Sequence, residues 1–396
     1  MQAANLQVTP LTQSPDAVDA GSVFAPAPNK PRRMYYGDAI RIFGTIAVVI
    51  GHVADLRMFD THVLDPHWWV CNLWDSFTRW AVPVYIMLSG ALLLDPARAE
   101  PSRDFYRKRL TRIGVPLVFW TAFFMWFDVV YTGWCPTWKE AWLKLALGKP
   151  YVHLHFIFRI AGLYVFTPML RVWLRHTHRN MQCWTVGMVL ALSAGDSIMN
   201  SITNNEPSVF ARFVPFIGYF LLGYLLRDTR LSARGIRRAW AGFITSYIVL
   251  LLGTALTVHL FHAPGTFLKG PPSLEMLQYD FLSPVRIAMS ICAWLLFVSL
   301  FNKPWPESEA ARQRIGWWAG TTLGVYLIHP MFREILYTRR IWIPGITQMH
   351  YLTFNLGPEW PNIVLGIPLM AIVVYALSLA VIAVVMKIPY VRRIAG

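Results

Sequence analysis

The sequence predicts an all-α polytopic membrane protein of about ten transmembrane helices, with both termini in the cytoplasm. Of its 396 residues, 55% are hydrophobic and 14% are charged. Apolar runs near twenty residues, the length that spans a bilayer as a helix, recur along the chain. Lys and Arg are also unequally distributed: with both termini inside, the cytoplasmic segments hold 23 of them and the outer segments 7, as expected of inward-facing loops.

The formal net charge of +15 follows from this loop bias, so no nucleic-acid partner is expected. Residues 1–33 are predicted to form a disordered cytoplasmic tail, since 1–30 are rich in Ala, Pro, Ser and Asn. They lack the charged start and apolar run of a signal peptide. Residues 34–396 are predicted to form a single transmembrane domain, because no later stretch is long and polar enough to fold separately.

Helices are the only credible spanning elements, because a helix satisfies its own backbone hydrogen bonds in lipid. Two large outer loops are expected: 262–280, rich in Pro and Gly, and 337–361, an aromatic loop suited to capping the outer face. The ten predicted spans are about 38–57, 77–94, 113–131, 152–173, 181–199, 208–226, 239–261, 282–301, 316–336 and 362–386.

The first predicted span has ionisable residues inside it. Its core from Ile40 to Val53 is apolar apart from three small residues, Arg41 and His52. Eleven positions amount to about three turns, so Arg41 and His52 share one face roughly 16 Å apart, and Asp38 shares it too. Ionisable groups inside a span indicate a functional site. A snorkelling Arg and a buried, hydrogen-bonded His would explain the same pattern.

Five motifs follow one another along the chain: Arg-x10-His (Arg41 and His52), VPVYIMLSGALLL (82–94), RKRLTRIGVPLVFW (107–120), HLHFIFRIAGLYVFTPMLR (153–171) and LGVYLIHP (323–330). In this order they resemble the motifs of the acyltransferase-3 family of integral membrane O-acyltransferases, in particular its branch that modifies surface polysaccharides. At His155 the chain departs from that branch, which usually has Trp there.

The resemblance implies an enzyme of the bacterial cell inner membrane. It would move an acyl group, expected to be acetyl, from cytoplasmic acyl-CoA to a hydroxyl of a cell-surface polysaccharide or its lipid-linked precursor. Acetyl-CoA is then a co-substrate, and no bound cofactor is expected. The acceptor sugar and the oligomeric state stay open.

Arg41, Arg109 and Arg112 are the predicted donor-binding residues. Guanidinium groups bind phosphate in a bidentate fork, and the resemblance aligns Arg109 and Arg112 with the family's Arg-x-x-Arg motif. The rise from Arg41 to His52 is comparable to an extended pantetheine arm. An ordinary positive-inside cluster, to which Arg107 and Lys108 also belong, is the alternative explanation.

His52 is the predicted general base, because an unperturbed imidazole takes up a proton near neutral pH. Asp38 is grouped with it as a catalytic candidate, and Asp55, three residues after His52, is placed to orient the ring. The oxyanion donors are not identified by the sequence. Ser89 and the amides near Gly90 are weak candidates, because a Ser-Gly pair in a span more often marks a close helix contact.

The predicted acceptor site draws on outer halves of the spans. Arg159 lies roughly 10 Å into the membrane by helical rise, which is too deep for comfortable snorkelling. His329 precedes Pro330, and both a structural and a cavity-lining role stay open for it. The predicted acceptor residues are Arg159, His153, His155 and His329, and Arg79, Arg212 and Arg286 are further buried cations whose packing role is equally open.

The four cysteines form no C-x-x-C pair, and the histidines follow no metal-binding spacing, so no metal site is expected. Cys71 and Cys135 both fall on the predicted outer side, where an oxidising periplasm permits a disulfide between them. Two unpaired interfacial thiols are the more common outcome for such a pair.

A transporter or exporter without chemistry, carrying a glycan or another anionic solute, is the rival function. Buried charges and ten spans suit it, but the chain has no paired interrupted spans in two matching halves. Release of free CoA thiol separates the two functions. Direct transfer in a ternary complex and an acyl-His52 intermediate both stay open for the enzyme.

Overall fold

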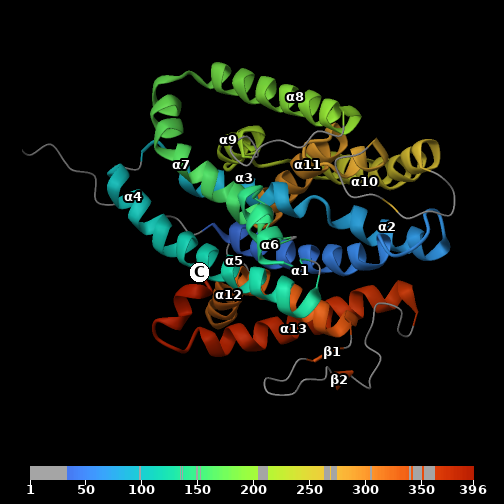
Figure 1. Cartoon of the computed structure of the whole chain (residues 1–396). Helices are drawn as coiled ribbons and strands as arrows, with labels where there is room; N and C mark the ends of the chain where they lie inside the picture. The colour runs from blue at the N-terminus through green and yellow to red at the C-terminus, as the bar shows by residue number, and fades with distance from the viewer. Residues whose placement is uncertain are drawn as a thin grey trace, which may run out of the picture. The chain divides into compact units, whose positions relative to one another are not determined.

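A computed structural model describes residues 34–97, 100–133, 135, 137–148, 150–151, 153–203, 213–262, 268, 274–303, 306–338, 340–341, 350–351 and 362–396. The predicted tail 1–33, Arg212 and most of the loops 262–280 and 337–361 lie outside these residues. Within them the chain is all-α (Figure 1), apart from β1 (Arg340–Ile341) paired antiparallel with β2 (His350–Tyr351). The predicted fold class is therefore confirmed.

The helical elements follow one another along the chain. They are α1 (Tyr35–Met58), α2 (Pro66–Thr78), α3 (Ala81–Leu93), α4 (Ser102–Arg109), η1 (Leu110–Gly114), α5 (Val115–Phe127), η2 (Asp128–Thr132), α6 (Trp138–Ala146), α7 (His155–His176), α8 (Arg179–Thr203), η3 (Val214–Phe216), α9 (Ile217–Leu225), α10 (Ala233–Phe261), η4 (Leu274–Tyr279), α11 (Pro284–Leu300), α12 (Glu309–Thr338), α13 (Ile363–Val385) and η5 (Val391–Ile394).

Seven helical segments of the described chain are long and apolar enough to cross a membrane, so the protein is a polytopic membrane protein. The other three of the ten predicted spans are not among these seven segments. They correspond to α8, to the shorter apolar stretch Val214–Leu225 and to α12. In α12 the buried polar side chains of Arg333 and Glu334 interrupt the apolar sequence. The number of spans and their orientation stay predictions. The seven segments are Tyr35–Met58, Pro66–Leu93, Ser102–Thr132, His155–His176, Ala233–Phe261, Met276–Leu300 and Ile363–Val385.

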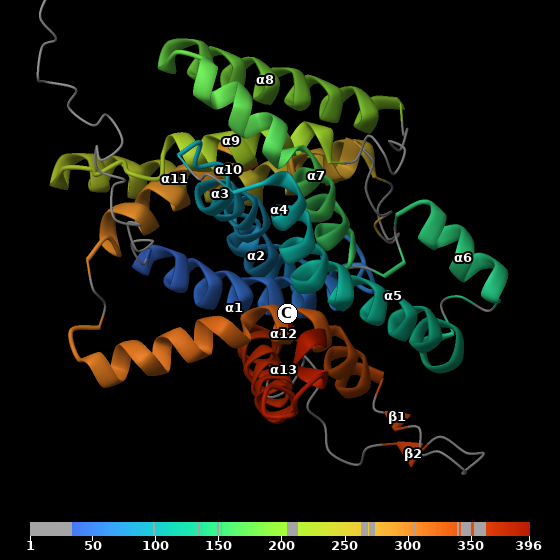
Figure 2. The same ribbon diagram turned by 90° about the vertical axis from the view of Figure 1, so that its left-hand side faces the viewer.

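The first helix, α1, is the centre of the transmembrane unit Tyr35–Gly396. It contacts α2, α3, α11, α12 and α13, and in both views it lies between α8 at the top and α13 at the bottom (Figures 1 and 2). Ala39, Ile40, Val53 and Ala54 are fully buried in it. A helix that is apolar nearly all round is expected in such a position, so its few polar side chains face other protein elements.

Prolines inside the helices create acceptors that other elements fill. A proline has no N–H, so the carbonyl four residues before it loses its helical partner. In α13, Pro368 frees the carbonyl of Val364, and the indole nitrogen of Trp74 in α2 donates to that oxygen at 3.1 Å. Re-satisfying a freed carbonyl is required within a membrane. Near His52 it is done once by a side chain of another helix and once by a side chain of the same helix.

Two glycines let α3 and α9 pack backbone to backbone. A Cβ atom added at Gly90 would lie 1.7 Å from the carbonyl oxygen of Phe220, and one added at Gly223 would lie 1.9 Å from that of Met87. Small residues at such a contact are typical of membrane helices. The close-contact interpretation of the Ser89–Gly90 pair is therefore confirmed for Gly90.

Replacing Gly90 by Ala is expected to lower the thermal unfolding temperature, because the added methyl group must push α9 away, at a cost of about 1–3 kcal/mol. Gly187→Ala in α8 is the matched control: a Cβ there meets nothing within 4 Å, and Ala favours a helix over Gly. Thermal unfolding of both variants in the same detergent measures the difference. Equal unfolding temperatures would contradict the close contact.

Cys71 and Cys135 are both free in the structure, so the disulfide is contradicted and the expectation of two unpaired thiols is confirmed. Both thiols are fully buried rather than interfacial. The reason is that they belong to different contacts. Cys71 lies on α2, which packs against α1 and α10, whereas Cys135 lies in a small cluster with Met125 and Ala141.

Candidate active site

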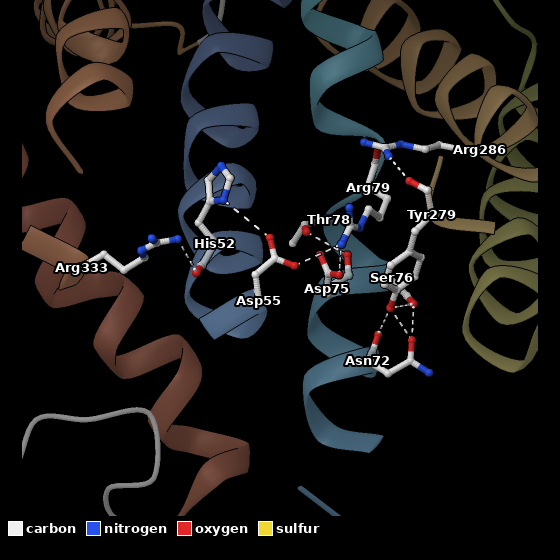
Figure 3. Close-up of polar contacts among 10 residues, drawn as sticks. All are labelled: His52, Asp55, Asn72, Asp75, Ser76, Thr78, Arg79, Tyr279, Arg286 and Arg333. Carbon is white, nitrogen blue, oxygen red and sulfur yellow. Dashed lines mark hydrogen bonds and ion pairs between the residues drawn. The ribbon is translucent and has the colours of Figure 1, made fainter. Parts of the chain in front are cut away.

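A break in the second membrane segment sets up the site. The segment Pro66–Leu93 is interrupted between α2 and α3, at Arg79. Pro83 frees the carbonyl of Arg79, and Nε of Arg286 in α11 donates to that oxygen at 2.7 Å. Another nitrogen of Arg286 donates to the carbonyl of Tyr279, also at 2.7 Å. This buried guanidinium therefore fixes the break and the end of η4 together (Figure 3).

The guanidinium of Arg79 joins two carboxylates from different helices. It pairs with Asp75 of α2 and, at 3.2 Å, with Asp55 of α1, and it lies 4.1 Å from the centre of the Tyr279 ring. The Tyr279 hydroxyl is in turn held by Ser76 at 3.0 Å. Arg79 therefore ties Asp55 of α1 to the break between α2 and α3.

His52 lies next to Asp55 on the same helix. Its Nδ1 is 3.6 Å from the nearer carboxylate oxygen of Asp55, which is slightly longer than a hydrogen bond. A small movement of either side chain toward the other would form the bond. Arg333 of α12 donates to the backbone carbonyl of His52 at 3.3 Å and pairs with Glu334. Figure 3 shows the other ring nitrogen directed away from Asp55. One imidazole nitrogen therefore faces a carboxylate, and the other is left for a ligand.

Two more histidines are buried beside His52. The ring of His329 lies 5.3 Å from that of His52, and the ring of His153 lies 5.7 Å from that of His329. Nδ1 of His329 is 2.7 Å from the carbonyl of Tyr326, which Pro330 frees. The geometry thus gives His329 a structural contact, and its Nε2 is a buried atom without a hydrogen-bond partner among the described residues.

Two adjacent cavities meet in this region. One of about 60 Å³ is lined by His52, Asp55, His155 and Arg79, among others. A second, of about 370 Å³, is lined by the three predicted donor arginines Arg41, Arg109 and Arg112. Phe156 and Tyr326 line both cavities, so these two side chains form the wall between them.

The three predicted donor arginines come from different elements. Arg41 pairs with Asp38 at 3.0 Å, and the hydroxyl of Tyr85 in α3 donates to its carbonyl at 2.6 Å. Arg109 and Arg112 flank the start of the π-helical turn η1, a distortion frequent at functional sites. The structure thus brings the three arginines to one cavity.

Asp38 lies at this donor end of α1. Fourteen residues separate it from His52, an axial rise of roughly 21 Å, and its ion pair is with Arg41. Its assignment as a catalytic residue stays an untested prediction, and the contact with Arg41 favours an effect exerted through that arginine.

The predicted acceptor residues divide into two groups. His155 lines the small cavity, and Arg159 lies between the rings of Phe216 and Phe281, 4.6 and 4.4 Å from their centres. Since Phe281 lines the small cavity, Arg159 is one ring removed from it. His153 and His329 are instead packed among the buried rings beside His52.

Sequence reasoning missed Asp75, Tyr279 and the wall residues Phe156 and Tyr326. The spacing of Asp75 and Arg79, four residues apart within an apolar segment, is a signal that could have revealed their pair. No comparable local signal points to the aromatic side chains. Among the described residues, no group of His, Cys, Asp and Glu side chains is arranged to hold a metal ion.

Comparison with protein families gives one match: a family model described as an acyltransferase domain matches residues 34–385. No curated protein and no solved structure matches the chain. The matched region begins at the start of α1 and includes both cavities except for Gly396.

Proposed function

The chain belongs to the acyltransferase-3 family and is a membrane acyltransferase, and we propose that it moves an acetyl group from cytoplasmic acyl-CoA to a hydroxyl of a cell-surface polysaccharide or its lipid-linked precursor. One observation carries the proposal: a cavity lined by Arg41, Arg109 and Arg112 adjoins a smaller one lined by His52. The expected location is a bacterial inner membrane with both termini inside.

The larger cavity suits the donor. Three guanidinium groups favour the phosphates of CoA, which they bind in a bidentate fork. The rise of roughly 16 Å from Arg41 to His52 lets a pantetheine arm run along α1 and bring its thioester to the wall formed by Phe156 and Tyr326. A shift of these two side chains would then join donor and acceptor cavities.

His52 acts as the general base in this proposal. Its outward nitrogen takes the proton of the acceptor hydroxyl as that oxygen attacks the thioester carbonyl carbon. The tetrahedral intermediate collapses, the carbon–sulfur bond breaks, and the CoA thiolate receives the proton from the imidazolium. Asp55 stabilises that imidazolium from Nδ1, as a carboxylate beside a histidine does in other acyl transfers.

Direct transfer in a ternary complex is the first choice, because the two cavities are separate and adjacent. An acyl-His52 intermediate is the second. The acceptor sugar is proposed to bind at the small cavity, with His155 at its wall and Arg159 behind Phe281. His153 and His329 hold the neighbouring side chains.

Release of CoA thiol tests the function. Purified protein in lipid nanodiscs is incubated with acetyl-CoA and with membranes from a strain lacking the gene, and free thiol and O-acetyl groups are measured. We expect thiol release that depends on those membranes and on His52. Absence of thiol release with every acyl-CoA and acceptor fraction would favour the transport alternative.

Removing the donor arginines is expected to weaken acyl-CoA binding. Arg41→Ala, Arg109→Ala and Arg112→Ala each remove one phosphate partner, worth about 1.5–3 kcal/mol, or roughly 10- to 150-fold in Kd. Arg41→Lys should bind poorly as well, because Lys has no bidentate fork. Isothermal titration with CoA gives the affinities.

Arg237→Ala is the matched control for these three variants. Arg237 is an exposed arginine of α10 that lines neither cavity, so its removal should leave Kd unchanged. Unchanged affinity in all three donor variants would mean that the arginines only orient the protein in the membrane.

A further inference from the structure

A third cavity continues the donor cavity away from His52. It measures about 450 Å³ and is lined by Thr111, Arg112, Arg392 and Arg393, among others. Arg112 and Gly396 line this cavity and the donor cavity alike. The two spaces are therefore neighbours, and a ligand bound in one reaches the other beside Arg112.

The segment that carries Arg392 and Arg393 is held in place. It forms η5, which packs against α5. The indole nitrogen of Trp120 in α5 donates to the carbonyl of Ile394 at 2.9 Å, and Ala395 is 1% exposed. The two arginine side chains are exposed themselves, but the backbone directly after them is anchored at Ile394 and Ala395.

The third cavity is strongly basic. Three of its lining residues are arginines, and no acidic side chain is among the described residues that line it. Three like charges around one space repel one another, so the arrangement favours a multiply charged anion between them. A guanidinium cluster of this kind suits phosphate more than a single carboxylate.

The order of the cavities matches the order of groups in acyl-CoA. The wall of Phe156 and Tyr326 lies next to the cavity of His52. The donor cavity follows, with Arg41, Arg109 and Arg112, and the third cavity comes last, with Arg392 and Arg393. In acyl-CoA the thioester is followed by the pantetheine arm, then by the diphosphate and then by the ribose with its 3′-phosphate.

We propose that Arg392 and Arg393 bind the 3′-phosphate of the donor's ribose, with Arg112 shared between that phosphate and the diphosphate. The inference rests on the proposed function, since it assumes an acyl-CoA donor. It makes the anchored segment 391–394 a selectivity element that separates CoA from nucleotides and thioesters lacking the 3′-phosphate. A lipid phosphate is the other source of the same chemistry, and the experiment distinguishes the two.

The test compares two ligands that differ by one phosphate, CoA and dephospho-CoA. Isothermal titration is done on the full chain in nanodiscs of neutral lipid and again in nanodiscs of anionic lipid, with wild type and with the double variant Arg392→Gln/Arg393→Gln. Wild type is expected to prefer CoA by about tenfold or more. The double variant should bind CoA only as well as dephospho-CoA, with the affinity for dephospho-CoA unchanged.

Arg237→Gln/Arg238→Gln is the matched control, since it removes an adjacent pair of exposed arginines in α10 that line none of the three cavities. This control should keep the wild-type preference. Arg392→Lys/Arg393→Lys should keep part of it, because the charge remains but the fork is lost.

Four outcomes would overturn the inference. A double variant that keeps the full preference for CoA shows that the 3′-phosphate binds elsewhere. Equal weakening of the binding of CoA and dephospho-CoA shows that the arginines act only through the overall electrostatic potential. A defect that appears only in discs of anionic lipid assigns them to a lipid headgroup. If wild type binds neither ligand, the acyl-CoA donor itself is wrong, and the proposed function fails with the inference.

Discussion

Replacing His52 by Ala is expected to lower the rate of acyl transfer by about 10²–10⁴-fold, the usual contribution of a general base. The acceptor hydroxyl then has no group to take its proton, because Asp55 stands behind the ring at 3.6 Å from Nδ1. Binding of CoA should be nearly unchanged, because the three donor arginines line the other cavity. Single-turnover release of CoA thiol and titration with CoA measure the two effects separately.

His176→Ala is the matched control, because His176 is an exposed histidine of α7 away from both cavities. It should transfer acyl groups at the wild-type rate. A His52→Ala enzyme that keeps more than about a tenth of wild-type turnover would remove the general-base assignment. Loss of CoA binding in step with activity would instead indicate a structural role for His52.

Two further measurements test the role of Asp55 and the choice between direct transfer and an acyl-His52 intermediate. If Asp55 only stabilises the imidazolium, Asp55→Asn should slow transfer and leave CoA binding intact. A covalent acyl-His52 species, detectable as a mass increase of the intact protein after mixing with acetyl-CoA alone, would favour the second course. Its absence together with rapid transfer in the presence of acceptor favours direct transfer.

The local part of this architecture was predictable from the sequence. Apolar runs of spanning length locate α1, α5 and α13, because a helix in lipid is decided by its own residues. The spacing of Arg41 and His52 predicts one face of α1, and the structure puts the two residues beside adjacent cavities. Helical periodicity carries such information directly.

Contacts between distant segments were not predictable in the same way. Arg286 lies 207 positions from the carbonyl that it fills at Arg79, and Arg333 lies 281 positions from His52. Nothing local in either segment specifies its partner. The wall residues Phe156 and Tyr326 resemble any other aromatic residues of a span. The Cys71–Cys135 pairing failed for this reason: both cysteines fell on the same predicted side, but the packing of α2 and α6 keeps them in different clusters.

Prolines explain the positions of two buried side chains near His52. Pro83 and Pro330 each free a carbonyl inside an apolar segment, and Arg286 and His329 fill the two acceptors. Filling such a carbonyl is worth more in lipid than in water. Arg286 therefore supports the break between α2 and α3, whereas Asp55, paired with Arg79, is the carboxylate that faces the ring of His52.

Replacing Arg79 by Met is expected to destabilise the protein by about 3–5 kcal/mol, the usual cost of breaking a buried ion pair by removing one partner. Asp75 is 2% exposed, and Asp55 of α1 loses its ion pair with Arg79, so two carboxylates remain in an apolar region without their cation. The expected result is a large fall in thermal unfolding temperature and loss of monodisperse protein in detergent. Arg238→Met, an exposed arginine of α10, is the matched control and should behave as wild type.

A second substitution tests whether the unpaired charge is the cause. Asp75→Asn in the Arg79→Met background removes one stranded carboxylate, so it should recover part of the lost stability. The hydrogen bond from Arg286 to the backbone carbonyl of residue 79 does not involve the side chain of that residue. Both variants should therefore keep it, and the helix break itself stays supported. The recovery should be absent with Asp104→Asn in the same background, because Asp104 is exposed on α4. If Arg79→Met unfolds at the same temperature as Arg238→Met, or if Asp75→Asn makes the variant less stable still, the Asp55–Arg79–Asp75 bridge does not hold α1 to the break between α2 and α3.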